Sequence, residues 1–190
     1  MSDGLVNLLD REAGNLSFAI SAFPLWVKTG FADYRHMLHS VGVSYWVGLG
    51  HHLGYTGIGE LPAPAMSPHS TASDDIRCDA VWFDRGSGVP VLLAEYERYE
   101  GPADYDKLQG KADNLLRAYH RWDRPHTLVL AYWAKRLLDL PDHNSLRRRI
   151  RSGFLTATRE WVPGGEATVL FYQFVHRESA GPVWYLGELV

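Results

Sequence analysis

The chain has 190 residues, 46% of them hydrophobic and 22% charged, which predicts a single globular domain over residues 1–190. Its formal net charge of −3 gives no global sign of nucleic-acid binding, which usually requires a basic domain. Its single cysteine, Cys78, excludes an intramolecular disulfide and a cysteine-rich zinc site. No apolar run approaches the roughly 18–20 residues of a membrane span and the start of the chain lacks a signal-peptide pattern, so we expect a cytoplasmic protein without a membrane partner.

The first part of the chain predicts helices. We expect residues 1–30 to form an N-terminal helical extension, and residues 31–55 carry apolar side chains at helical spacing. Glycines in the second half of that segment leave two alternatives open, one long helix or two helices separated by a break. A short strand is expected near residues 56–61, and the proline- and serine-rich stretch 61–75 is typical of an exposed connection.

The segment from Ile76 to Arg98 predicts two strands joined by a tight turn. Both strands are rich in β-branched and aromatic residues, and two glycines within residues 85–88 supply the backbone freedom that a tight reversal needs. A hairpin symmetric about Ser87 predicts three opposed pairs: Asp84 with Pro90, Val81 with Leu93, and Asp79 with Glu95.

Three acids, Asp79, Glu95 and Glu97, converge at the open end of this predicted hairpin. Opposed residues share a face of a sheet, and so do residues two apart on one strand. Like charges placed in this way destabilise the sheet unless they are neutralised, and a divalent cation held by carboxylate oxygens would do so. Each acid taken alone is more simply explained as a solvated strand residue, but the three together predict a metal site.

The second half of the chain alternates helices and strands. Residues 102–122 predict a helix that begins near a proline, residues 126–133 a buried strand, and residues 140–160 a further helix. Residues 167–178 and 182–190 predict two final strands. The whole pattern predicts an α/β domain with a mixed sheet.

A run of arginines lies in the predicted helix 140–160. On this helix Leu146, Ile150 and Phe154 would face inward. The exposed arginines would be Arg147, Arg148 and Arg151. Two interpretations stay open, a face that contacts nucleic-acid phosphates and an ordinary solvated helix face.

The order of these elements, with an aspartate on one hairpin strand and an acid-x-acid pair at the end of the next, resembles the PD-(D/E)XK nuclease-like superfamily over residues 31–133. The resemblance implies a mixed central sheet flanked by helices with a restriction-endonuclease-like αβββαβ core. Residues 134–190 would add a C-terminal helix and two strands. It also implies that Asp79 and Glu95 bind Mg²⁺ or Mn²⁺, and Glu97 stands where the superfamily has a lysine.

Two residues could take the role of that lysine. Glu97 would accept the proton of the attacking water or act as a further metal ligand. Alternatively, Lys111 on the following helix, which shares a helix face with Lys107, would supply the ammonium group, as in some relatives. A solvated face in which these two lysines pair with Asp104 and Asp106 explains them equally well. Arg98 and Lys107 would then neutralise substrate phosphates.

Two further groups were weighed as ligands. Relatives often place an acid on the first helix near the metal, and Asp33 is the closest positional match, with Glu60 a weaker one. His36 and His39 share a helix face, but no acid or cysteine in the sequence completes a zinc set with them. We therefore expect these histidines to be surface or core residues.

The expected function is metal-dependent hydrolysis of phosphodiester bonds in DNA or RNA, which would make the chain a nuclease with Mg²⁺ or Mn²⁺ as its cofactor. A bound cation lowers the pKa of water from about 15.7 toward roughly 7 and so supplies hydroxide at neutral pH. The alternative is a catalytically inactive protein of the same fold that binds nucleic acid or a protein partner. A homodimer is compatible with either function.

Overall fold

The fold is that of a computed structural model, which describes residues 2–13, 15, 17–30, 34–65, 76–135, 140–178 and 184–189. Its helices are α1 (Ser2–Glu12), α2 (Ser17–Ala22), α3 (Tyr34–His52), α4 (Tyr105–Arg121) and α5 (His143–Ser152), with a π-helical turn over Leu25–Thr29 and a 3₁₀ turn over Pro102–Asp104. Its strands are β1 (Thr56–Pro62), β2 (Arg77–Phe83), β3 (Pro90–Arg98), β4 (Thr127–Ala134), β5 (Gly153–Leu155), β6 (Trp161–Pro163), β7 (Thr168–Glu178) and β8 (Trp184–Leu189).

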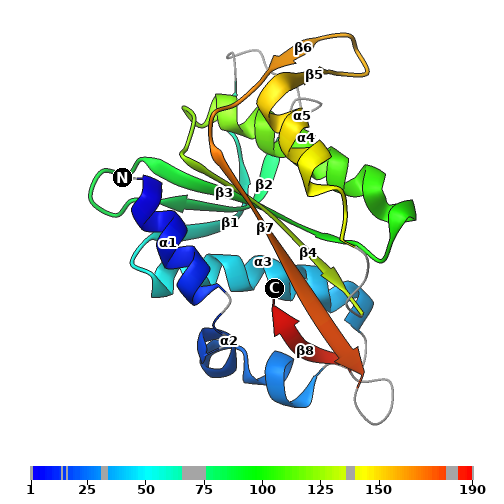
Figure 1. The fold of residues 1–190 in the computed structure, drawn as a ribbon. Helices are drawn as coiled ribbons and strands as arrows, with labels where there is room; N and C mark the ends of the chain where they lie inside the picture. The colour runs from blue at the N-terminus through cyan, green and yellow to red at the C-terminus, as the bar shows by residue number, and fades with distance from the viewer. Residues whose placement is uncertain are drawn as a thin grey trace.

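A mixed sheet of six strands, in the order β1-β2-β3-β4-β7-β8, forms the centre of the described structure. β1, β2 and β3 form an antiparallel meander, β3, β4 and β7 run parallel, and β8 is antiparallel to β7. β5 and β6 form a separate antiparallel pair. α3 lies on one side of the sheet, and α4 and α5 lie on the other (Figure 1). The predicted α/β class with a mixed sheet flanked by helices is confirmed.

The two faces of the sheet bury separate hydrophobic cores. The core beneath α1, α2 and α3 includes Trp46 and Trp82, and the core beneath α4 and α5 includes Leu115 and Ile150. All eight residues of β4 are buried, because helices cover both faces of this parallel strand.

α3 runs without a break from Tyr34 to His52, so this segment forms one helix and not two. Two of its glycines, Gly42 and Gly50, lie where the helix touches the sheet. A β-carbon at Gly42 would overlap the ring of Tyr96, and one at Gly50 would lie 2.8 Å from the ring of Trp82. The glycines therefore allow the helix to approach the sheet more closely than alanine would.

The turn between β2 and β3 differs from the symmetric hairpin that the sequence predicts. Asp84 does not face Pro90, which pairs with Phe83 after a β-bulge. The carboxylate of Asp84 instead accepts hydrogen bonds from backbone N–H groups within the turn, which is the usual way that aspartate fixes such a turn. The predicted pair of Val81 and Leu93 is confirmed.

The last helix is shorter than predicted. α5 ends at Ser152 because Gly153 adopts a φ of 81°, which an L side chain disfavours, and the chain continues as β5. Phe154 is buried, but from this strand and not from the helix. The predicted inner face of the helix is confirmed for Leu146 and Ile150, both of which are buried.

We expect Gly42→Ala to lower the free energy of unfolding by about 1–3 kcal/mol, because the added methyl group forces the helix or the Tyr96 ring to move. Urea unfolding measures this loss. The matched control is Gly110→Ala in α4, where an added β-carbon meets nothing within 4 Å. The control should gain up to about 1 kcal/mol from the higher helix propensity of alanine. Equal effects at the two sites would contradict close packing at Gly42.

A buried histidine on β7 should make the fold sensitive to acid. His176 accepts a hydrogen bond of 2.8 Å from the indole N–H of Trp26, and burial lowers the pKa of His176 to about 3. The unfolded chain takes up this proton near pH 6.5, while the folded chain does so only near pH 3. Stability should therefore fall as the pH drops from 6.5 toward 3.

His176→Gln keeps an acceptor for Trp26 and removes the titration. In urea unfolding between pH 7 and pH 4, the wild type should lose up to about 1.4 kcal/mol per pH unit more than the variant does. Parallel curves for the two proteins would show that His176 is not held in its neutral form.

Candidate active site

β2 and β3 separate at one end of their hairpin, and polar side chains fill the gap. Their regular pairing ends at Ala80 opposite Ala94. Beyond that pair, the backbone N–H of Tyr96 donates to Asp79 Oδ2 at 2.7 Å, where a regular ladder would use a backbone carbonyl. The separation thus brings a carboxylate between the two strands.

Lys111 of α4 joins the two acids that the hairpin register places opposite each other. Its Nζ lies 3.0 Å from Asp79 Oδ2 and 2.6 Å from Glu95 Oε2. The side chain of Asn114 donates to the other oxygen of Glu95 and also to the backbone carbonyl of Arg77. Glu95 is fully buried and Asp79 is 6% exposed. The structure therefore brings together three of the predicted site residues, Asp79, Glu95 and Lys111.

The charges of this cluster depend on one another. Burial raises the pKa of Glu95, and the nearby charge of Asp79 raises it further against the opposing effect of Lys111. Burial alone would lower the pKa of Lys111, but Glu95 and Asp79 outweigh burial and raise it. Lys111 therefore stays an ammonium ion and acts as the counter-ion of the buried acids.

A second set of ligand atoms lies on the opposite side of Asp79. His39 Nε2 of α3 lies 3.7 Å from Asp79 Oδ1 and 3.8 Å from Glu60 Oε1. Ligand atoms of the three residues all lie within 4.8 Å of one another. An imidazole nitrogen and two carboxylate oxygens are a donor set that divalent transition metals accept, so these residues fit a cation.

The register of β1 explains why Glu60 belongs to this set. Gly59 pairs with Ala80 and Leu61 pairs with Cys78, so Glu60 lies opposite Asp79. Opposed like charges destabilise a sheet unless they are neutralised. The backbone of Glu60 has a φ of 52°, which is uncommon for a residue other than glycine.

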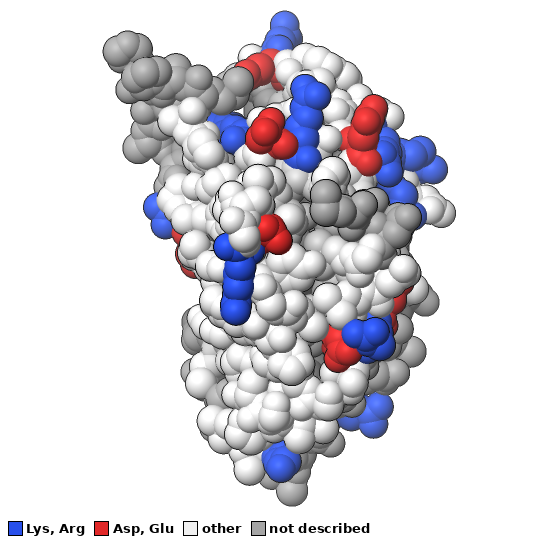
Figure 2. All heavy atoms as spheres, turned by 90° about the vertical axis from the view of Figure 1, so that its left-hand side faces the viewer, with Lys and Arg blue, Asp and Glu red and all other residues white. Residues whose placement is uncertain are grey.

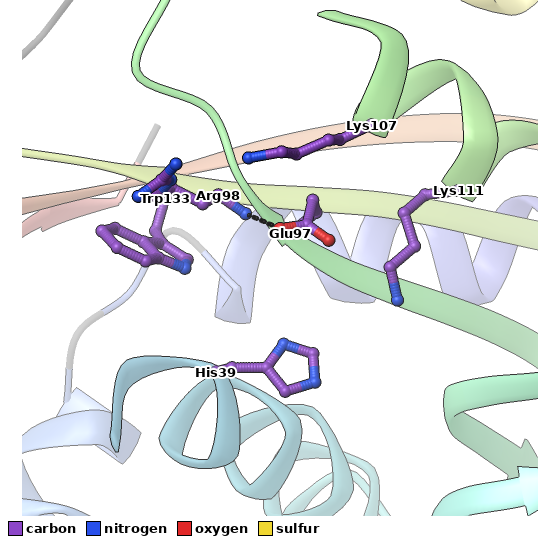
Figure 3. A pocket seen from close by; sticks show the side chains of 6 residues that line it. All are labelled: His39, Glu97, Arg98, Lys107, Lys111 and Trp133. Atoms are coloured by element: carbon purple, nitrogen blue, oxygen red, sulfur yellow. Dashed lines mark hydrogen bonds between the residues drawn. The ribbon is translucent and has the colours of Figure 1, made fainter. Parts of the chain in front are cut away.

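A pocket of about 460 Å³ opens beside both sets of residues. Lys107 and Lys111 reach into it from α4, His39 from α3, and Glu97 and Arg98 from β3 (Figure 3). The carboxylate of Glu97 accepts a hydrogen bond of 2.8 Å from the backbone N–H of Arg98. Glu97 therefore lines the pocket and is not part of the His39, Glu60 and Asp79 set.

The predicted substrate-contacting residues fall into two places. Arg98 and Lys107 line the pocket, and both pair with Asp104, at 3.6 and 2.8 Å. The predicted arginines of α5 are all exposed and none of them lines this pocket; they are Arg147, Arg148 and Arg151. Asp33, the predicted acid of the first helix, lies outside the described residues.

Sequence reasoning did not find His39 or Asn114. His39 was visible as a helical histidine, but its acidic partners come from β1 and β2, and only the tertiary fold supplies them. Asn114 lies three residues after Lys111 on α4, and residues at that spacing share a helix face. This spacing could have indicated Asn114 once Lys111 was a candidate.

No protein-family model, no curated protein and no solved structure matches this chain. Among the described helices, none combines the length and the apolarity that crossing a membrane requires. The inference of function therefore depends on the geometry of the site.

We expect Lys111→Met to lower the free energy of unfolding of the cation-free protein by about 3 kcal/mol or more at pH 8, because it leaves buried carboxylates without their counter-ion. The loss should be smaller at pH 5. Without the ammonium group, which lowers the pKa of Glu95, Glu95 binds its proton more tightly when folded, so its contribution to stability is present at low pH and is lost as the pH rises.

Urea unfolding in the presence of a chelator at the two pH values measures this effect. The matched control is Lys107→Met, one helical turn earlier. The ammonium group of Lys107 pairs with Asp104, and the lysine side chain is 47% exposed. The control should change stability by no more than about 0.5 kcal/mol. A Lys111 variant that behaves like the control would contradict the counter-ion role.

Proposed function

We propose that this protein is a metal-dependent phosphodiester hydrolase acting on DNA or RNA. The observation that carries the proposal is the ammonium group of Lys111, which bridges Asp79 and Glu95 at the open end of a hairpin. Two buried acids with an adjacent lysine, beside a pocket lined by further cationic side chains, suit a negatively charged substrate.

The order of the elements supports the proposal. α3, β1, β2, β3, α4 and β4 follow one another in the αβββαβ order that a restriction-endonuclease-like core implies. In the proposed site, Lys111 of α4 takes the place of the lysine that the PD-(D/E)XK pattern has where Glu97 stands. A lysine on a helix can replace a lysine on a strand when its ammonium group reaches the same acidic side chains.

The proposed cofactor is Mg²⁺ or Mn²⁺. Asp79 would hold the cation, together with either Glu95, as the resemblance implies, or His39 and Glu60 on the other side of the carboxylate. A bound cation supplies Lewis-acid polarisation of the phosphate and lowers the pKa of a bound water.

The side chains of the pocket would stabilise charge, transfer the proton and bind the substrate phosphates. Lys111, which stays protonated, would stabilise the negative charge that develops on the phosphoryl oxygens as water attacks phosphorus and the bond to the leaving oxygen breaks. Glu97 lines the same pocket and would accept the proton of the attacking water. Arg98 and Lys107 would hold the flanking phosphates.

The face that Figure 2 presents offers no broad basic area to a nucleic acid. Figure 2 shows acidic and basic side chains interspersed over the face it presents, with no continuous basic area. The net charge of −3 agrees with this distribution. Nucleic acid would therefore be held by a small number of cationic side chains, among which we propose the exposed arginines of α5.

The test is cleavage of linear and circular duplex DNA, single-stranded DNA and RNA in the presence of Mg²⁺, Mn²⁺ or a chelator. The wild type should cleave at least one substrate with a cation and none with the chelator. Asp79→Asn and Lys111→Met should each lower the rate by at least about 100-fold, because each removes charge stabilisation from the transition state.

Asp123→Asn is the control, because it makes the same change of carboxylate to amide at an exposed turn after α4. Its rate should equal that of the wild type. Absence of cation-dependent cleavage by folded wild type would overturn the hydrolase. Binding of nucleic acid that is equal with and without cation would then favour the non-catalytic alternative.

A further inference from the structure

We propose that this chain binds one transition-metal cation of the Mn²⁺ type between His39, Glu60 and Asp79, and that Glu95 anchors Lys111 and is not a ligand. The role of the cation in catalysis rests on the proposed function. The new part is the assignment of the residues that bind the cation. It departs from the ligand set that the acid motif implies, Asp79 with Glu95 and Glu97.

The two oxygens of Asp79 have different surroundings. Oδ2 accepts hydrogen bonds from the backbone N–H of Tyr96 and from Lys111. Within the described part of the chain, no group donates a hydrogen bond to Oδ1, which lies toward His39 and Glu60. A carboxylate that is 6% exposed thus directs an oxygen without a donor into the His39 side of the site, where a cation would satisfy it.

Both oxygens of Glu95 are already engaged by donors. One oxygen accepts from Lys111 at 2.6 Å and the other accepts from Asn114. Glu95 is 0% exposed. Ligation by Glu95 would have to compete with at least one of these donors and expose a buried group, whereas ligation by Asp79 Oδ1 displaces no donor within the described part of the chain. The hydrogen bonds therefore favour a site on the far side of Asp79.

The three ligand atoms are close enough to converge on a cation. Neighbouring ligands held about 2.1 Å from a six-coordinate cation lie roughly 3.0 Å apart. His39 Nε2 lies 3.7 Å from Asp79 Oδ1 and 3.8 Å from Glu60 Oε1, and all three atoms lie within 4.8 Å of one another, so the side chains would have to close by about 1–2 Å around the ion. A protonated imidazole bonded directly to the two carboxylates would lie closer, at about 2.7–2.9 Å.

The imidazole of His39 favours a transition-metal cation over Mg²⁺. Mg²⁺ strongly prefers oxygen ligands, while imidazole nitrogen suits first-row transition metals. The side chains of His39 and Glu60 are 42% and 55% exposed, so a cation reaches them from solvent. We therefore expect the site to take Mn²⁺ in preference to Mg²⁺.

Calorimetric titration of the chelator-stripped full chain with MnCl₂ and separately with MgCl₂ tests the assignment. Wild type should bind one Mn²⁺, with at least about tenfold weaker affinity for Mg²⁺. His39→Asn and Glu60→Gln should each weaken Mn²⁺ binding by at least about tenfold, because each removes a ligand. Glu95→Gln should stay within about threefold of the wild type, because the amide can keep its place beside Asn114.

His51→Asn is the matched control, an exposed histidine on the same helix, and it should bind Mn²⁺ like the wild type. Thermal unfolding verifies that each variant is folded. If Glu95→Gln does not fold, the Mn²⁺ affinities of His39→Asn and Glu60→Gln decide the question. Weakening by at least about tenfold in both variants supports the site, and wild-type affinity in both overturns it. No bound Mn²⁺, or Mn²⁺ binding that is lost in Glu95→Gln and kept in His39→Asn, also overturns it.

The cleavage assay separates this inference from the proposed function. Mn²⁺ bound at His39 without any cleavage would uphold the site and overturn the hydrolase. Cation-dependent cleavage that is unchanged in His39→Asn would uphold the hydrolase and overturn the site.

Discussion

The arrangement of this protein depends on one ammonium group placed between two buried carboxylates. Lys111 lies within hydrogen-bond distance of Asp79 and Glu95 at the point where β2 and β3 separate. Without a positive charge there, the separation would place two acids in a space with little water, and their mutual repulsion would oppose the fold. The packing of α4 on the β2–β3 hairpin therefore depends on the ion pairs of Lys111 with Asp79 and Glu95.

Asp79 connects the two layers of helices across the sheet. One of its oxygens contacts α4 through Lys111, and the other lies toward His39 on α3. The sheet contributes a backbone N–H from Tyr96 to the same carboxylate. The Asp79 side chain thus contacts residues of both helices, and a shift of either helix would change the distances from its carboxylate to the neighbouring charges. The packing of α3 and α4 therefore sets the electrostatic environment of Asp79.

The sequence predicted the pairs that local patterns determine. A hairpin symmetric about Ser87 predicted the register of Val81 and Leu93, and the same register continued along the strands places Asp79 opposite Glu95. Lys111 became a candidate through the resemblance, in which a lysine of the following helix takes the place of the missing one. Asp84 was misplaced because a bulge depends on side-chain capping of the turn. His39 and Glu60 were not recognised as partners, because their contact depends on how α3 packs against the β1 edge, and one chain carries no local signal for that packing.

Gly42, although its side chain is a single hydrogen, influences the distance between His39 and the sheet. It lies three residues after His39 on α3, and residues at that spacing share a face of a helix. The size of residue 42 therefore influences how far the His39 imidazole lies from the sheet. In the cation site that we propose, a larger residue 42 would widen the spacing of the ligands without itself contacting the ion.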